Sequence, residues 1–163
     1  MPTYALGEYQ AEIARGAVLL DTNLLFARFT RDDARADEAS YFFEFAGPLL
    51  VPLCVIGEAW GLMVGKHKQR DSGIEMLRWV ATPGSATIIR DDEELARQSE
   101  ALVARYDVDF VDAMLMLLAD RLSRQCLGTP IPIATLDIRD FSILRRAKTH
   151  TFQVYDVASG DTW

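Results

Sequence analysis

Very short apolar runs recur along this sequence, and longer stretches with helical patterning separate them. The run at Val18 to Leu20 is wholly apolar, as is typical of a strand that is buried on both faces of a parallel sheet. Further strands are expected at 49–51, 131–135 and 152–155, with 86–89 as a short strand or an extended link. Because short strands that alternate with helices favour parallel pairing, the sequence predicts an α/β sandwich with a mainly parallel central sheet.

Capping residues and prolines delimit the expected helices. Asp and Asn side chains accept hydrogen bonds from the first N–H groups of a helix, and proline fits its first turn. On these signals, helices are expected through 29, from 32 or 33 to about 46, from 52 to about 66, from 71 to 80, from 91 onward and from 109 to about 126. In such a fold the carboxyl ends of the strands gather ligands. Residues just past the strands at 18–20 and 131–135 are therefore expected at one rim.

With 163 residues and no repeat or linker, the chain has the size of one domain. We expect residues 17–163 to form this domain and residues 1–16 to be an N-terminal extension. The N-terminus lacks the basic start and the long apolar stretch of a secretory signal, and the apolar runs are too short to span a bilayer. The two cysteines, Cys54 and Cys126, form no metal-binding or disulfide pattern. A cytoplasmic protein without a membrane segment is expected.

The formal net charge of −7 argues against a broad nucleic-acid-binding surface. Local basic residues nevertheless occur in two patches, with Lys66, Lys68 and Arg70 in one and Arg145 and Arg146 in the other. Each patch has two interpretations. It is either a solvated helix end, where the helix dipole favours cations, or a contact surface for substrate phosphates.

Four carboxylates lie inside apolar sequence, either just past a strand or on a helix. They are Asp21, Glu58, Asp112 and Asp137. A lone carboxylate in such surroundings is costly to desolvate. If the fold brings the four together, each pair repels by roughly 3 kcal/mol at about 5 Å and an effective dielectric of about 20. Such a cluster needs raised pKa values or a bound cation, and oxygen ligands suit Mg²⁺ or Mn²⁺. The pattern is typical of a metal-dependent site that cleaves phosphodiesters.

Two of these acids have purely structural interpretations as well. An Asp that follows a strand is more often an N-cap than a catalyst, although Thr22 and Asn23 are available to cap and would leave Asp21 free to point across the rim. Glu58 would be ordinary on a solvated helix face. Its neighbours one turn away on both sides are apolar, however, which predicts that Glu58 lies on the core-facing stripe of its helix.

The later acids compete for their roles. Asp112 lies on or beside the buried face of its helix, where a first-turn carboxylate also suits the helix dipole. Asp109 is expected to cap that helix and to be an auxiliary ligand at best. Asp137 follows an apolar strand, and the hydroxyl of Thr135 is available to orient it. Asp137 is therefore favoured as the site residue, and Asp140 as the cap of the following helix or a supporting residue.

Taken in order, the four acidic segments resemble the PIN domain, the nuclease fold of VapC-type toxins in bacterial toxin–antitoxin pairs. The matching stretches span about 18–155 and are Leu20-Asp21-Thr22-Asn23, Glu58, Phe110-Val111-Asp112-Ala113 and 135–141. This resemblance implies a three-layer α/β/α domain with Mg²⁺- or Mn²⁺-dependent endoribonuclease activity. It also implies a homodimer, and an antitoxin that reaches into the acidic cleft.

The family's catalytic and metal-binding acids then correspond to Asp21, Glu58, Asp112 and Asp137, with Thr22, Asn23 and Thr135 as polar supports. The hypothesis is metal-assisted hydrolysis of an RNA phosphodiester with no protein nucleophile. A phosphatase of the haloacid dehalogenase type fits poorly, because Asn23 stands where that class has its second Asp. Two alternatives stay open: a non-catalytic module that docks a basic partner peptide, and an RNA-processing nuclease outside a toxin–antitoxin pair.

Overall fold

The computed structural model describes residues 3–4, 16–30, 32–126, 129–148 and 150–163, and within them one seven-stranded sheet forms the middle of the molecule. The spatial order of its strands is β1-β4-β3-β2-β5-β6-β7, and every neighbouring pair is parallel except β6 and β7. The mainly parallel sheet is therefore confirmed. The bounds are β1 (Thr3–Tyr4), β2 (Val18–Leu20), β3 (Leu49–Pro52), β4 (Thr87–Ile89), β5 (Ile133–Thr135), β6 (Val154–Asp156) and β7 (Asp161–Thr162).

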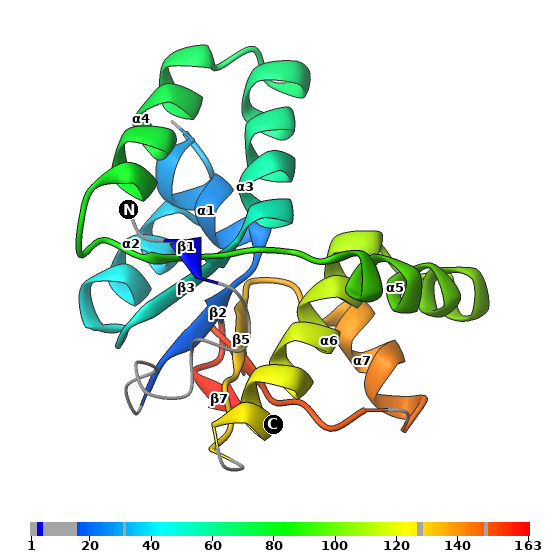
Figure 1. The fold of residues 1–163 in the computed structure, drawn as a ribbon. Helices are drawn as coiled ribbons and strands as arrows, with labels where there is room; N and C mark the ends of the chain where they lie inside the picture. Colours follow the sequence, from blue (N-terminus) through cyan, green and yellow to red (C-terminus); the bar gives the residue numbers. More distant parts are fainter. Residues whose placement is uncertain (1–2, 5–15, 31, 127–128, 149) are drawn as a thin grey trace.

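Helices cover both faces of this sheet, which gives the three layers that the sequence resemblance implied (Figure 1). One group consists of α1 (Thr22–Phe29), α2 (Ala36–Phe45), α3 (Leu53–Trp60), the π-helical segment η2 (Gly61–Lys66) and α4 (Arg70–Ala81). The other group consists of α5 (Glu93–Tyr106), α6 (Phe110–Gln125) and α7 (Arg139–Arg146). Within the described residues, no helix is both long and apolar enough to cross a membrane.

The sheet reverses its winding direction next to β2. The chain runs outward from β2 through β3 to β4, and then returns to place β5 on the other side of β2. In such sheets a crevice opens at the carboxyl ends of the two strands that flank the reversal. These strands are fully buried at Leu19, Leu20, Ile133 and Ala134. The backbone of a polar residue that directly follows either strand is therefore close to the core.

Several element boundaries differ from the sequence predictions. The helix expected from Asp32 or Asp33 begins at Ala36, because Asp32 has a left-handed φ of 63° and the Asp33 carboxylate accepts the N–H of Arg35 at 2.7 Å. That contact makes a local turn instead of a helix start. The sheet also has a strand that the sequence did not predict, β7, which pairs antiparallel with β6.

The N-terminal region also contributes to the sheet. β1 lies inside the predicted extension and pairs in parallel with β4 through Thr3 and Ile88. Residues 5–15, which make up most of that extension, lie outside the described residues. The division into residues 1–16 and 17–163 therefore stays a prediction.

Candidate active site

A pocket of about 370 Å³ opens at the crevice beside β2 and β5. We call it the acidic pocket. It is lined by the four predicted acids, by four of the predicted supporting residues and by three further side chains. These residues are Asp21, Glu58, Asp112 and Asp137, then Thr22, Asn23, Asp109 and Asp140, then Phe26, Leu62 and Arg139. The fifth supporting residue, Thr135, is fully buried and hydrogen-bonds to Asp21.

Asp21 is the most enclosed of the four acids, with only 4% of its surface exposed. The sequence left open whether Asp21, Thr22 or Asn23 caps the helix. Asp21 is itself the N-cap of α1, because its extended backbone places the carboxylate 2.6 Å from the N–H of Thr22. The carboxylate also accepts hydrogen bonds from the Asn23 amide at 2.8 Å and the Thr135 hydroxyl at 2.6 Å.

Burial raises the pKa of Asp21 to about 7, even though the bonds from Thr135 and Thr22 lower it. The nearby charges of Glu58 and Asp137 add to the increase. Asp21 therefore caps a helix and also lies against other acids, so the structural and functional interpretations of this residue are compatible.

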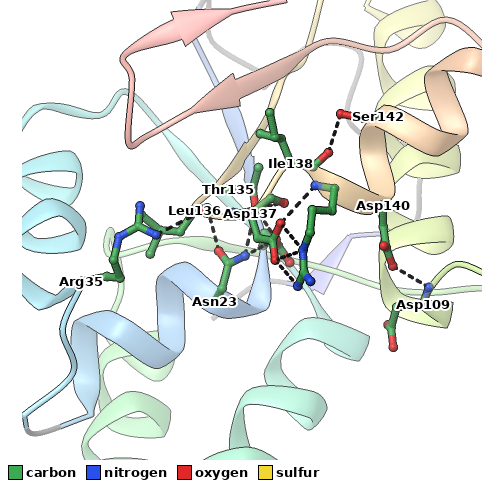
Figure 2. A network of polar contacts seen from close by, with 11 residues as sticks. Asn23, Arg35, Asp109, Thr135, Leu136, Asp137, Ile138, Asp140 and Ser142 are labelled. Atoms are coloured by element: carbon green, nitrogen blue, oxygen red, sulfur yellow. Dashed lines mark hydrogen bonds and ion pairs between the residues drawn. The ribbon is translucent and has the colours of Figure 1, made fainter.

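Hydrogen bonds tie the supporting residues to three different elements. The Thr22 hydroxyl on α1 donates to Glu58 Oε2 on α3 at 2.5 Å. The Asn23 amide donates to the Thr135 hydroxyl at 2.9 Å, and its oxygen accepts the N–H of Leu136 at 3.0 Å (Figure 2). These bonds hold α1, α3 and the end of β5 together around the pocket. Burial raises the pKa of Glu58, and the charge of Asp109 raises it further, while the Thr22 hydroxyl lowers it.

The start of α6 contributes two acids. Asp109 caps this helix, as predicted, by accepting the N–H of Val111 at 2.8 Å. Burial raises the pKa of Asp112 to about 9, and the charges of Asp21, Asp109 and Asp140 and a hydrogen bond with Asp140 all raise it as well. Asp112 is therefore an acid that keeps its proton at neutral pH when no cation is bound.

Asp140 does not cap α7, so of the two roles that the sequence left open for it, cap or supporting residue, the cap is excluded. That helix begins at Arg139, and its N-cap residue, Ile138, makes no side-chain cap bond. Because Asp140 is already inside the first turn, its carboxylate extends toward α6, where it accepts the N–H of Asp109 at 2.9 Å (Figure 2). Asp140 thus joins the start of α7 to the start of α6 at the edge of the acidic pocket.

Asp137 differs electrostatically from the other three acids. Its carboxylate accepts hydrogen bonds from Nε of Arg139 at 2.8 and 3.0 Å and from Nη2 at 2.5 Å. These bonds hold the pKa of Asp137 below its ordinary value, although partial burial acts in the opposite direction. The side chain of Asp137 is 42% exposed and that of Arg139 is 84% exposed. The ion pair therefore faces solvent, and a competing cation can reach Asp137 without passing through the core.

Sequence reasoning missed Phe26, Leu62 and Arg139. Phe26 follows Thr22 by four residues and Leu62 follows Glu58 by four, so each lies one helical turn beyond a predicted site residue on the same face. That spacing was the available signal for both. Arg139 comes two residues after Asp137, the spacing at which an Asp side chain bonds to the backbone ahead of it.

The five predicted nucleic-acid-binding residues are not among the described residues that line the acidic pocket. Lys68 donates to the Gly65 carbonyl at 2.6 Å, and Arg70 lies 5.9 Å from the centre of the Trp60 ring. Lys66 is in the last turn of η2, and Arg145 and Arg146 are in the last turn of α7. The placements of Lys66, Arg145 and Arg146 agree with the helix-end interpretation, whereas Arg70 is the first residue of α4, where the helix dipole disfavours a cation. Phosphate contact by these residues stays a prediction.

The donor chemistry of the acidic pocket fits a hard divalent cation. Within the part of the chain that the structure describes, no three Asp, Glu, His or Cys side chains are already placed to hold a metal ion. The pocket nevertheless presents carboxylate oxygens, the ligands that Mg²⁺ and Mn²⁺ prefer. The pKa values of Asp21, Glu58 and Asp112 are raised by burial and by neighbouring negative charge, and a bound cation would relieve both effects.

Comparison with known proteins adds an independent finding. The sequence profile of the PIN domain matches residues 18–142, which include all four predicted acids and most of the sheet. The chain belongs to the PIN domain family. No curated protein matches this PIN domain chain at a significant level.

Solved structures share the fold of this PIN domain. One is VapC20 of Mycobacterium tuberculosis, described as a sarcin-ricin loop cleaving toxin, with a TM-score of 0.62 at 18% identity over 77% of this chain and 93% of the other. A toxin–antitoxin complex from Klebsiella pneumoniae gives 0.51 at 25% identity over 77% and 90% of the two chains. VapBC2 of Rickettsia felis, bound to a DNA fragment from its promoter, gives 0.56 at 13% identity over 86% and 99%.

Proposed function

We propose that this PIN domain protein is a divalent-metal-dependent endoribonuclease and the toxin of a toxin–antitoxin pair. The observation that carries the proposal is the acidic pocket, which is lined by carboxylates from four separate segments at the crevice of the sheet. Three of these acids have raised pKa values, as expected of a site that needs a cation. The similar structures include a toxin described as cleaving the sarcin-ricin loop, a toxin–antitoxin complex and VapBC2 bound to promoter DNA, which supports the same assignment.

In the proposed reaction, Asp21, Glu58, Asp112 and Asp137 hold Mg²⁺ or Mn²⁺ in the acidic pocket. When bound, the cation supplies Lewis acidity, which lowers the pKa of a water molecule and neutralises charge that develops on the scissile phosphate. Asp112 loses its carboxyl proton when the site is loaded, because a ligating carboxylate must be ionised.

The remaining residues of the acidic pocket position these ligands. Thr22 fixes one oxygen of Glu58, and Asn23 and Thr135 fix one oxygen of Asp21. A carboxylate that is held by such bonds loses little conformational freedom when it ligates. No described cysteine is needed, and burial raises the pKa of the Cys54 thiol, which makes it a poor nucleophile.

Protein partners are part of the proposal. We infer an antitoxin whose basic segment enters the acidic pocket, as the pocket already accommodates the guanidinium of Arg139 against Asp137. We also infer a homodimer, which the family resemblance implies. The same charge complementarity is the basis of the alternative function, a non-catalytic module that docks a basic peptide. Binding of Mn²⁺ in calorimetry distinguishes the two, because a docking module needs no metal.

The test is cleavage of an end-labelled structured RNA by the purified chain, with Mn²⁺ or with EDTA. The wild type is expected to cleave with Mn²⁺ alone, and Asp21→Asn is expected to lose at least about a hundredfold in rate, because it removes a charged ligand. Asp37→Asn is the matched control, since Asp37 is exposed on α2. Cleavage that persists in EDTA and in Asp21→Asn would overturn the metal-dependent mechanism.

A further inference from the structure

A second pocket of about 390 Å³ adjoins the acidic pocket. The two pockets share Asn23, Phe26 and Asp137 in their linings, so they adjoin each other past the end of β5, and we call the two together the groove. Arg35 lines the second pocket. Figure 2 shows Arg35 and Asp140 at opposite ends of a row that passes through Asn23 and Asp137. We call the second pocket the flanking pocket.

Phe26 gives the groove an aromatic surface where the two pockets meet. Its side chain is half-buried, and the centre of its ring lies 4.8 Å from that of the exposed His67. An aromatic ring beside a phosphodiester-cleaving site is suited to stack on a nucleobase, and such stacking tolerates any base because every base has a π-face. The hydrogen bonds of Asp21 and Asn23 on the preceding turn of α1 hold the position of Phe26 relative to the acids.

Arg35 supplies the positive charge of the flanking pocket, whose lining also includes the acids Asp33 and Asp137. Its Nε and Nη2 atoms lie 2.6 and 2.5 Å from Glu38 Oε2, and its Nη1 donates to the Leu136 carbonyl at 3.4 Å. These contacts fix the guanidinium plane and use three of its five N–H groups, so donors are available for a phosphate oxygen. The side chain is 37% exposed, so a bound strand can reach it.

We propose that the flanking pocket binds the nucleotide next to the scissile phosphate, with its base stacked on Phe26 and its phosphate on Arg35. The inference rests on the proposed ribonuclease function and deepens it by naming the two residues that hold a nucleotide beside the scissile phosphate. A base inside an A-form duplex is stacked between its neighbours and cannot reach an aromatic side chain. The substrate therefore has an unpaired nucleotide beside the cleavage position, as in a loop or a single strand.

The test measures binding of two fluorescein-labelled eight-residue probes by anisotropy with Mn²⁺ present. One is oligouridine, and the other is an abasic oligomer with the same backbone. Asp21→Asn serves as the background so that the RNA stays intact. Adding Phe26→Leu is expected to weaken binding of oligouridine by about tenfold, the effect of losing one stack, and to leave the abasic probe unchanged. Phe26→Tyr, which keeps the ring, is expected to restore binding.

Two matched controls separate stacking from charge and from folding. Tyr41 is 69% exposed on α2 outside the groove, so Tyr41→Leu is expected to change neither affinity. Arg35→Gln is expected to weaken both probes by the same factor, whereas Arg97→Gln on α5 is expected to weaken neither. Equal losses for the two probes in Phe26→Leu, or no loss at all, overturn the stacking site. Failure of the Asp21→Asn background to bind either probe also overturns it.

Cleavage by proteins with an intact Asp21 distinguishes this inference from the proposed function. If the wild type cleaves single-stranded RNA and Phe26→Leu has an unchanged KM, the flanking pocket is not the nucleotide site and the nuclease assignment stands. If Phe26→Leu raises KM about tenfold with a smaller effect on kcat, both are supported. If the wild type cleaves no RNA with Mn²⁺, the proposed function fails first.

Discussion

Asp112→Asn is expected to make the metal-free protein more stable at neutral pH, although it removes a proposed ligand. Burial and three neighbouring acids raise the pKa of Asp112 from 3.8 to about 9. An Asn side chain has nearly the same shape as the protonated acid, and it donates a hydrogen bond to Asp140 just as the protonated acid does. The variant is therefore expected to keep the folded structure. Because Asn does not ionise, folding of the variant no longer requires a proton to be taken up at position 112.

The sign and size of the effect are set by proton linkage. Between pH 3.8 and about 9, the folded state holds a proton on Asp112 that the unfolded chain has released. Because the folded state binds more protons, the free energy of unfolding falls as the pH rises through this window. From 3.8 to pH 7, at about 1.4 kcal/mol per pH unit, the loss is at most about 4 kcal/mol. Asp112→Asn is expected to recover between about 1 and 4 kcal/mol of it.

Urea unfolding, followed by circular dichroism in EDTA at pH 5.5, 7.0 and 8.5, measures this difference. The stability gain of Asp112→Asn over the wild type is expected to grow with pH, while the exposed control Asp37→Asn shows no such trend. With Mn²⁺ in excess the order is expected to reverse, because binding stabilises only the protein that keeps its ligand. A gain that is absent, or that shrinks as the pH rises, refutes the argument that Asp112 is buried among negative charges.

Two further changes act on the contacts that position the acids. Arg139→Gln removes the cation that is bonded to Asp137, so Mn²⁺ is expected to bind several-fold more tightly in isothermal titration calorimetry; an unchanged Kd contradicts competition at Asp137. Thr22→Val deletes the hydroxyl that donates to Glu58, at an expected cost of about 1–2 kcal/mol in unfolding free energy. NMR titration should then show a higher pKa for Glu58, and no change contradicts the contribution of that bond.

The sequence predicted the central strands and their helices well, for a definite physical reason. A strand such as Val18–Leu20, with parallel neighbours on both sides and buried faces, must be apolar throughout, and the residues that cap the next helix come directly after it. β1 gave no such signal. Two residues, Thr3 and Tyr4, have no periodicity, and their strand geometry depends on pairing with β4 about 85 positions later in the chain.

At the candidate site, the sequence indicated which acids share the acidic pocket but not how each is bonded. Apolar context predicted that all four acids are desolvated. This holds for Asp21 and Asp112, where burial raises the pKa to about 7 and about 9, whereas the side chain of Asp137 is 42% exposed and its pKa is lowered. The sequence left two roles open for Asp140, and the role of helix cap is excluded because α7 begins one residue before it. A carboxylate at that position can hydrogen-bond either to its own helix or to the start of α6. Which of the two it does depends on how the two helices pack, and the local sequence does not determine that.

The π-helical geometry of η2 has an evolutionary consequence. A π turn closes its hydrogen bonds over one residue more than an α turn, so the segment Gly61–Lys66 resembles an α-helix that has gained a residue. Deletion of one residue in this segment would restore α-helical geometry and would rotate the residues that follow it by about 100° around the helix axis. Glu58 precedes the extra residue and would keep its position, whereas Lys66 and His67 follow it and would face a different direction from the helix axis. Such a deletion would leave Glu58 in register, but it would also move Leu62 of the acidic pocket or the fully buried Met63, because both lie within this segment.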